Sequence, residues 1–229
     1  MEEERNKPLY FEAASMPAAG AWAHRRRLAA ALREIIDSLI SSDASEEELA
    51  AATHEAAALA ARLRAQPSGS RHAGYAETSV SGNSGAFFDQ SPLIGLSNPL
   101  SPPMSLEVVG DRIAGRVVFG AAYEGPPGHV HGGFVAAAFD EVLGFAQTLT
   151  GNPGMTAGLT IRYRRPTPLR AELRFDAGVD RVEGRKIFTS GALRDGDTVT
   201  AEAQGVFVSV DAERFQQLLR GAAGRVGAG

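Results

Sequence analysis

One segment of the sequence is apolar almost all round, and it limits the possible folds more than any other. Between Phe134 and Leu149 there are two apolar helical stripes where a surface helix has one. Their members are Phe134, Ala138, Val142, Phe145 and Leu149, and Val135, Phe139, Leu143 and Ala146. A helix that is apolar on every side is normally buried. Other elements must therefore enclose this helix, which we expect from about residue 131 to residue 149.

Alternating patterns on both sides of the helix predict the strands that enclose it. They lie at about residues 106–109, 113–119, 156–164, 169–182, 186–194 and 198–210. In the clearest one, six apolar residues from Leu169 to Val179 alternate with polar residues. Glu183-Gly184 and Asp195-Gly196 are hairpin turn signals, and short turns join antiparallel neighbours. The sequence therefore predicts an α+β hotdog fold, in which an antiparallel sheet wraps round one long central helix.

The N-terminal region has a different pattern, with two helices over residues 18–65. Ser45 and Glu48 form a capping box at the start of the second helix. Each helix has one narrow apolar stripe and a charged face, so the pair needs a partner surface, unless it is a structural hairpin without chemistry. We expect a helical segment at 1–66, a linker rich in Gly, Ser and Pro at 67–90, the hotdog domain at 91–210, and a short helix with a flexible tail at 211–229.

Composition excludes several classes of function. The 229 residues include no cysteine, which rules out disulfides, thiolate metal sites and a cysteine nucleophile. A net charge of -4 gives no general electrostatic reason to bind nucleic acid. No apolar stretch approaches the roughly 18 residues that a membrane span needs, and Arg33 and Glu34 interrupt the run that most resembles a signal peptide. We expect a cytoplasmic protein without a membrane or nucleic-acid partner.

Two carboxylates, Asp140 and Glu141, lie within the apolar helix. Burying a carboxylate without partners is costly, so each is either functional or placed at the sheet edge with solvent or an arginine. Asp140 has the small neighbours Ala136, Ala137 and Gly144, which leave room for a ligand. Asp140 is therefore a candidate catalytic group.

The start of the same helix is the second candidate. It begins with His131-Gly132-Gly133, and the first N–H groups of a helix lack internal acceptors and carry the positive end of its dipole. Glycine lets a ligand approach such donors, which suit a developing oxyanion. The alternative is a glycine-rich loop that only permits a tight turn. His129, His131 and Asp140 are a weak match to a zinc site, and we predict no metal and no cofactor.

Helix geometry decides how the two candidates cooperate. His131 and Asp140 are nine residues apart, which in a straight helix means about 13 Å of rise and about 900° of rotation, so they point to opposite sides. A base and an oxyanion donor must each come within about 3 Å of their targets. If both act on one substrate, the site combines Asp140 of one subunit with the Gly132 end of another. The protein is then at least a homodimer, and a tetramer stays open.

These residues resemble the motif of a known enzyme family. His131-Gly132-Gly133, Asp140, Thr156 and the strand that ends in Arg162-Tyr163-Arg164-Arg165-Pro166 are similar to the PaaI-type hotdog acyl-CoA thioesterases, in the 4-hydroxybenzoyl-CoA thioesterase superfamily. The similarity is strongest to the group with the motif HGG-x6-D, which includes the human THEM proteins. It covers about residues 91–210 and implies hydrolysis of an acyl-CoA thioester to the free acid and CoA.

The resemblance also implies catalytic roles. The Gly132 N–H would polarise the thioester carbonyl, and His131 would position that group. Asp140 of the partner chain would be the base for the attacking water or the nucleophile. Thr156 would orient the water, unless it is an ordinary strand threonine.

For substrate binding, the resemblance points to Gly133, Arg164 and Arg165, with the arginines where basic residues of the family meet CoA phosphates. Alternatively, the two arginines are only solvent-exposed charges at the end of a strand, without a role in binding. Two other functions stay open. One is a hotdog dehydratase or hydratase that acts on acyl thioesters, and the other is a non-catalytic acyl-CoA-binding module in which Asp140 is structural.

Overall fold

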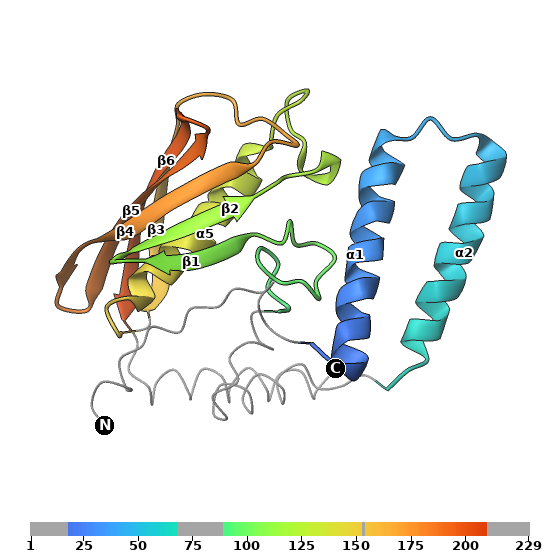
Figure 1. The fold of residues 1–229 in the computed structure, drawn as a ribbon, viewed down its shortest axis with the longest axis horizontal. Coiled ribbons are helices and arrows are strands. Elements are labelled where there is room, and N and C mark those ends of the chain that lie inside the picture. The colour runs from blue at the N-terminus through green and yellow to red at the C-terminus, as the bar shows by residue number, and fades with distance from the viewer. Residues whose placement is uncertain (1–17, 68–88, 153, 210–229) are drawn as a thin grey trace.

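The computed structural model describes residues 18–67, 89–152 and 154–209. In these ranges two N-terminal helices stand beside a curved sheet that holds one long helix (Figure 1). The elements are α1 (Gly20–Ser41), α2 (Glu46–Arg64), β1 (Ser105–Val109), β2 (Arg112–Val117), η1 (Ala121–Tyr123), α5 (Gly132–Thr148), β3 (Gly154–Tyr163), β4 (Leu173–Glu183), β5 (Lys186–Asp195) and β6 (Thr198–Ser209). The predicted tail at 211–229 and most of the predicted linker lie outside the described residues.

The six strands form one antiparallel sheet in the order β1-β2-β4-β5-β6-β3. Its three hairpins turn at glycines with positive φ: Gly110 at 64°, Gly184 at 57° and Gly196 at 54°. Glycine adopts this conformation without a steric penalty, so these turns can stay short and fix the strand register. The predicted α+β hotdog fold is confirmed.

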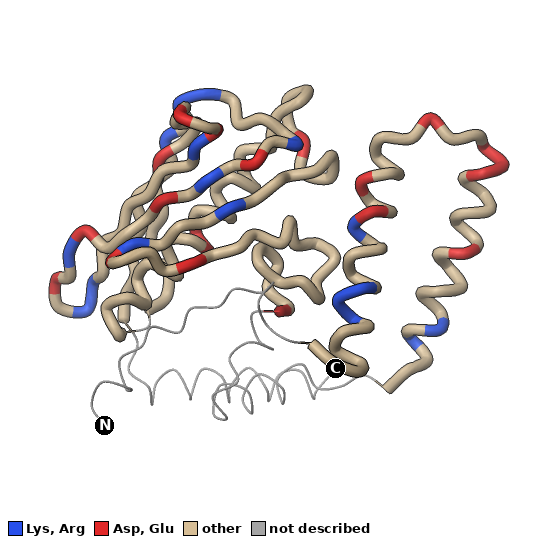
Figure 2. Tube along the Cα trace, in the orientation of Figure 1, with Lys and Arg blue, Asp and Glu red and all other residues tan. Residues whose placement is uncertain are grey.

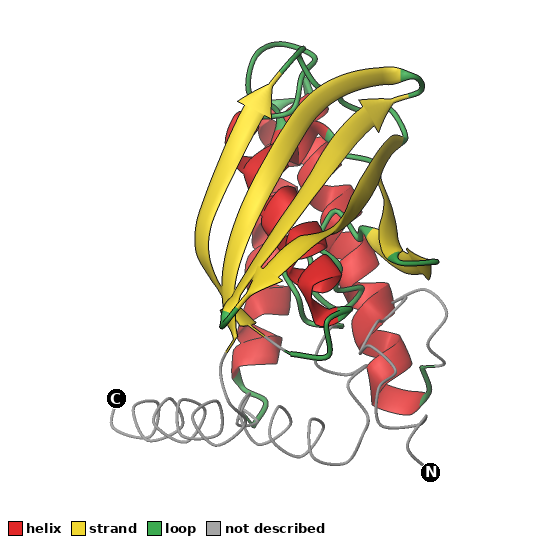
Figure 3. Cartoon of the chain, turned by 90° about the vertical axis from the view of Figure 1, so that its left-hand side faces the viewer, coloured by secondary structure: helices red, strands yellow, loops and turns green. Residues whose placement is uncertain are grey.

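Helix α5 lies on the concave side of the sheet, as Figure 3 shows. Phe139 of α5 packs edge-on against Phe175 of β4, with ring centroids 5.1 Å apart. The segment before β1 reaches α5 as well, where Ser91 Oγ lies 3.4 Å from Glu141 Oε1, and its Ile94 is part of the same core. Because the helix has neighbours beyond the sheet, apolar residues are needed around most of its circumference.

The strand expected from Leu169 begins four residues later, at Leu173. Arg170 has a φ of 58°, which extended strands do not adopt. The backbone amides of Leu169 and Arg170 donate instead to the carbonyl oxygens of Gly128 and Phe119, at 3.0 and 2.8 Å. The alternation of half-buried and exposed side chains nevertheless continues through this segment. The predicted strand therefore began too early, because the prediction relied only on the alternation of apolar and polar side chains.

The N-terminal helices form the predicted hairpin. Ser45 Oγ accepts a hydrogen bond from the Glu48 amide at 3.2 Å, as the capping box requires. Helix α1 lies against η1 and the segment before β1, whereas α2 lies beyond α1 and buries none of its residues (Figure 1). Neither helix, nor α5, is both long and apolar enough for a bilayer crossing in the part of the chain that the structure describes.

Candidate active site

Helix α5 begins at Gly132, with His131 as its N-cap. His131 Nδ1 accepts a hydrogen bond from the Gly133 amide at 3.0 Å, and the His131 carbonyl oxygen accepts one from Phe134 at 2.9 Å. Among the described residues the Gly132 amide has no acceptor. Gly132 therefore offers the first donor of the helix to an outside group, whereas the Gly133 amide, predicted to contact substrate, is occupied by His131.

A tight loop holds this N-cap in place. The Gly125 amide donates to the His129 carbonyl oxygen at 2.9 Å, and the His131 amide donates to the Tyr123 carbonyl oxygen at 2.8 Å. A Cβ atom on Gly125 would lie only 2.7 Å from the His131 Cα atom, so the close approach requires glycine. Gly128, with a φ of 74°, closes the loop. The glycine-rich stretch before the helix thus fixes the position of His131.

Tyr163, at the end of β3, belongs to the same site, although the sequence pattern did not single it out. Its hydroxyl donates to the Gly132 carbonyl oxygen at 2.7 Å. Its ring lies so close that a Cβ atom on Gly132 would be 3.2 to 3.4 Å from the Tyr163 hydroxyl and ring. An exposed tyrosine on a strand is common, so only the contact reveals its importance.

Asp140 lies two turns further along α5, beside the other end of β3. Thr156 Oγ1 donates to Asp140 Oδ1 at 2.9 Å. A bulge at Ala157 shifts the pairing with β6 just after Thr156. Asp140 and Thr156 are both exposed in the single chain. These two candidate residues, which the rest of α5 and a turn separate in the sequence, are thereby brought into contact.

Glu141, the second carboxylate of α5, is partly shielded from water by other residues of the same chain. Burial raises its pKa to about 7, the Ser91 hydroxyl opposes the rise, and the neighbouring Asp140 charge adds to it. The sequence singled out Asp140 as the catalytic candidate and did not predict which of the two carboxylates is buried. In the single chain Glu141 is half-buried and Asp140 is exposed.

The site lies along a free edge of the sheet. Strand β3 is the last strand in the sheet order, and within the described residues it pairs only with β6. Most of its residues are exposed, including Met155 and Tyr163, each at 54%. A ten-residue strand with one unpaired edge is a ready template for another strand. Thr156 with Asp140, and Tyr163 with Gly132, lie along this edge.

The two predicted CoA-binding arginines differ in their surroundings. Arg164 Nε lies 2.7 Å from Glu202 Oε2, in an exposed ion pair. Arg165 is exposed, and its side chain has no ion pair with the residues that the structure describes. The amides of both residues donate to the Thr200 carbonyl oxygen, at 2.8 and 3.0 Å. The backbone of both arginines is therefore held in place by hydrogen bonds. Of the two, only the Arg164 guanidinium group forms an ion pair with a described residue.

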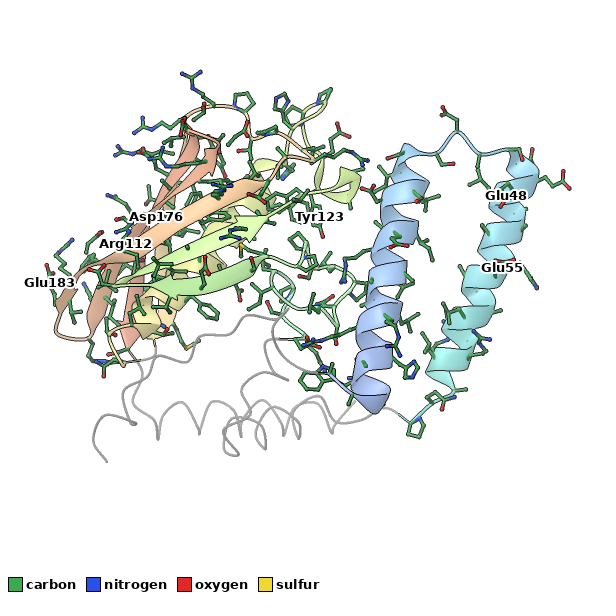
Figure 4. The ribbon with its side chains drawn as sticks, viewed as in Figure 1. Glu48, Glu55, Arg112, Tyr123, Asp176 and Glu183 are labelled. Carbon is green, nitrogen blue, oxygen red and sulfur yellow. The ribbon has the colours of Figure 1, made fainter. Side chains whose placement is uncertain are left out.

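The weak zinc alternative finds no support in the geometry. His129 Nδ1 lies 2.8 Å from the Pro127 carbonyl oxygen, and His131 Nδ1 is occupied by Gly133. Within the described residues, no three histidine or carboxylate side chains gather as metal ligands would. Two shallow hollows, one of them beside the Arg112–Asp176 pair that Figure 4 labels, open on the outer face of the sheet and include no residue of the candidate site.

The fold and this site together define a hotdog-fold domain with a carboxylate and a free helix N-terminus at one sheet edge. The family model of the thioesterase superfamily matches residues 127–203, which hold every candidate site residue. A crystal structure of a thioesterase superfamily protein superposes with a TM-score of 0.71 at 34% identity, and covers 84% of this chain and 97% of that chain. The chain belongs to the thioesterase superfamily.

Curated relatives add a more specific similarity. The acyl-coenzyme A thioesterase THEM4 of Xenopus laevis is 38% identical over 93 residues, which is 40% of this chain and 42% of the relative. THEM4 of Bos taurus is 39% identical over 97 residues (42% and 40%), and human THEM5 is 35% identical over 96 residues (41% and 39%). The chain thus matches about two fifths of the length of these relatives.

Proposed function

We propose that the protein hydrolyses acyl-CoA thioesters to a carboxylic acid and free CoA, at a site that two subunits share. The observation that carries the proposal is the position of Asp140 and Gly132. Asp140, held by Thr156, and the unpaired Gly132 amide both lie along the free edge at β3. The acyl-CoA thioesterases among the relatives support the choice of substrate.

A second subunit completes the site. Within one α5, Gly132 and Asp140 are eight residues apart, which is about 12 Å of rise, too far for both to act on one carbonyl group. Pairing the β3 edges of two subunits about a two-fold axis would bring Asp140 of each beside the Gly132 end of the other, and would cover the exposed edge. Two equivalent sites result.

The reaction proceeds in two steps. The Gly132 amide, at the positive end of α5, donates to the thioester carbonyl oxygen and stabilises the negative charge that develops there. Asp140 of the partner subunit, oriented by its Thr156, takes a proton from water as the water oxygen attacks the carbonyl carbon. The C–S bond then breaks, and the proton returns to the CoA thiolate. Water and thioester become acid and thiol.

The first experiment replaces the base. Asp140→Asn keeps the shape of the side chain and removes its basicity, so thiol release from a panel of acyl-CoAs should fall by about 10²-fold or more. The matched control is Asp176→Asn on the outer sheet face, which should leave turnover unchanged. Near wild-type turnover of Asp140→Asn with a folded protein would refute the mechanism. With substrate in excess, a pre-steady-state burst of thiol would point to Asp140 as a nucleophile.

A complementation experiment tests the sharing of the site. Gly132→Pro removes the amide donor and suits the first position of a helix, whereas Gly132→Ala adds a Cβ atom and keeps the donor. Gly132→Pro should be inactive, and Gly132→Ala should retain much more activity. Mixed dimers of Gly132→Pro and Asp140→Asn should regain activity, because one of their two sites is intact. No recovery after verified subunit exchange would exclude a shared site.

Other expectations from the sequence stay predictions. These are the absence of a cofactor, the cytoplasmic location, and the binding of CoA phosphates by Arg164 and Arg165. For the arginines, Arg165→Ala should raise KM for acyl-CoA more than Arg164→Ala, since Arg164 is already paired with Glu202.

A further inference from the structure

Helix α1 is attached to its own domain mainly by charged and polar side chains. Arg26 forms an ion pair with Asp89 at 2.8 Å. Arg33 donates to the Asn98 carbonyl oxygen at 2.9 Å, and Asp37 Oδ1 accepts from an amide of η1 at 2.6 Å. Only one residue of α1, an alanine, is fully buried. The docking of α1 therefore uses little of the apolar stripe that the sequence places on it.

The C-terminal half of that stripe and most of α2 are not covered by other described residues. Twelve large apolar side chains are exposed among the described residues, and six of them are on this hairpin. They are Ile35, Ile36, Leu39 and Ile40 of α1, and Leu49 and Leu63 of α2, from 37% to 60% exposed. Among the elements that the structure describes, none packs extensively on helix α2. An apolar surface of this kind on a soluble domain indicates a contact with another molecule.

The charges of the hairpin are separated along its length, as Figure 2 shows. The open end, where α1 begins and α2 ends, is basic, and the end with the turn is acidic. The basic residues are Arg25, Arg27, Arg62 and Arg64, and the acidic residues are Asp43, Glu46, Glu47 and Glu48. Figure 4 shows Glu48 and Glu55 on α2, with α1 between them and the domain. These charges do not serve the attachment of the hairpin to its own domain.

We propose that two copies of this chain associate through their α1–α2 hairpins, in antiparallel orientation, as a four-helix bundle. A two-fold axis across the helices brings the basic end of each hairpin against the acidic turn of the other, twice in the same contact. A parallel arrangement would place like charges together. Two layers of two helices also enclose the narrow apolar stripes that a single hairpin leaves open.

This contact is separate from the catalytic edge. The hairpin lies against η1 and the segment before β1, whereas the free edge of the sheet is β3, at the other end of the strand order. The hairpins therefore join catalytic dimers to one another, and each chain takes part in two different two-fold contacts. The smallest closed assembly with both contacts is a tetramer.

The first test removes apolar surface from the hairpin. In Ile35→Glu/Leu39→Glu the mass of the full chain in solution, measured by light scattering after gel filtration, should be half that of the wild type. The control, Val109→Glu/Val182→Glu, changes two equally exposed apolar residues outside the hairpin and should keep the wild-type mass. Circular dichroism verifies the fold, and hydrolysis of acyl-CoA reports separately on the catalytic edge.

The second test exchanges charges and leaves the apolar residues intact. Arg62→Glu/Arg64→Glu cancels the net positive charge of the open end, and Glu46→Arg/Glu47→Arg cancels the net negative charge of the turn. Neither variant alone keeps the attraction between the unlike ends of two hairpins, so each should have half the wild-type mass. An equimolar mixture of the two should recover the wild-type mass, because opposite charges meet again. Arg181→Glu/Lys186→Glu, with the same charge change at the β4–β5 turn, should have no effect.

Either of two results overturns the proposal. One is a wild-type mass equal to that of Ile35→Glu/Leu39→Glu, since the hairpin then joins no copies. The other is a mixture of the charge variants that stays at half the wild-type mass. If all masses change as proposed but the wild-type protein hydrolyses no acyl-CoA, the result counts against the proposed function alone.

Discussion

The hydroxyl of Tyr163 donates to the carbonyl oxygen of Gly132 at 2.7 Å, and so ties the end of β3 to the first turn of α5. Among the described residues the Gly132 amide has no acceptor, so it is free to donate a hydrogen bond to an outside group. Its carbonyl group and its amide belong to successive peptide units, so the hydrogen bond limits how far the amide can turn. The edge strand thus positions the donor that we propose for the oxyanion.

Tyr163→Phe should lower kcat by about 2- to 10-fold, since the net worth of a hydrogen bond is about 0.5–1.5 kcal/mol and the ring remains. Tyr123→Phe is the matched control, because its hydroxyl donates to the Leu100 carbonyl oxygen, also at 2.7 Å, and not to α5. Tyr123→Phe should lower the free energy of unfolding and leave kcat unchanged. Steady-state kinetics and urea unfolding of both variants test this prediction. Equal kcat values for Tyr163→Phe and Tyr123→Phe would contradict a positioning role for Tyr163.

The hydrogen bond between Thr156 and Asp140 leads to a second prediction. Thr156→Val keeps the shape of the side chain and removes the donor, so Asp140 loses its orientation, and kcat should fall about 10-fold, as expected for a hydrogen bond to a charged group. Thr156→Ser restores the hydroxyl and should recover most of the activity, with KM similar in all three proteins. If Thr156→Ser is as slow as Thr156→Val, the hydroxyl is not the reason for the effect.

Sequence reasoning predicted the hotdog fold because the signals were local and consistent. The doubly apolar segment at 134–149 requires enclosure, and the turn glycines require antiparallel hairpins. The start of β4 was misplaced because alternation continues through Arg170, whereas its left-handed backbone interrupts the ladder. Side-chain periodicity reports which face is buried and carries no information about main-chain pairing.

For the site, the sequence identified Gly132 and Asp140 by their chemistry and spacing, but it left two matters to the structure. One is the contact of Tyr163 with Gly132, which joins residues 31 positions apart. The other is which of the two neighbouring carboxylates, Asp140 or Glu141, the single chain buries. In a helix that is apolar all round, periodicity does not define a solvent side. Glu141 is the more buried of the two because the segment at Ser91 lies against it. The position of that segment depends on the whole fold.

The attachment of α1 depends on a buried charge and leads to a third prediction. The Asp89 side chain is 1% exposed and contacts Arg26, Trp22 and Ser97. Asp89→Asn removes the negative charge of this largely buried ion pair, and should lower the free energy of unfolding by about 2–4 kcal/mol. Hydrogen exchange in α1 should rise in this variant before exchange in α5. If hydrogen exchange rises equally in α1 and α5, Asp89 does not act locally on the attachment of α1.

The control for Asp89 is Glu107→Gln, which breaks an exposed pair. Glu107 and Arg116 lie 3.4 Å apart and are about half exposed. An exposed pair contributes about 0–1 kcal/mol, so the unfolding free energy of Glu107→Gln should hardly change. Equal losses in the two variants would mean that burial is not what makes the Asp89 pair important.

Glu141 leads to the last prediction, on pH. Burial raises its pKa from an ordinary value of 4.5 to about 7. Between these two values the folded state binds more protons at Glu141 than the unfolded state, so the contribution of Glu141 to stability falls as pH rises. Below pH 4.5 the side chain is neutral in both states and has no such effect. Above pH 7 the loss is complete, and at about 1.4 kcal/mol per pKa unit it is at most about 3 kcal/mol.

Glu141→Gln is neutral at every pH and therefore isolates this effect. Its unfolding free energy should match that of the wild type near pH 4, exceed it increasingly up to about pH 7, and keep a constant advantage above that. Urea unfolding of both proteins from pH 4 to pH 8 measures the difference, in which the titration of all other carboxylates cancels. If the wild type is instead the more stable protein at pH 8, the ionised Glu141 side chain has a cationic partner in the assembled protein, and the direction of its pKa shift is reversed there.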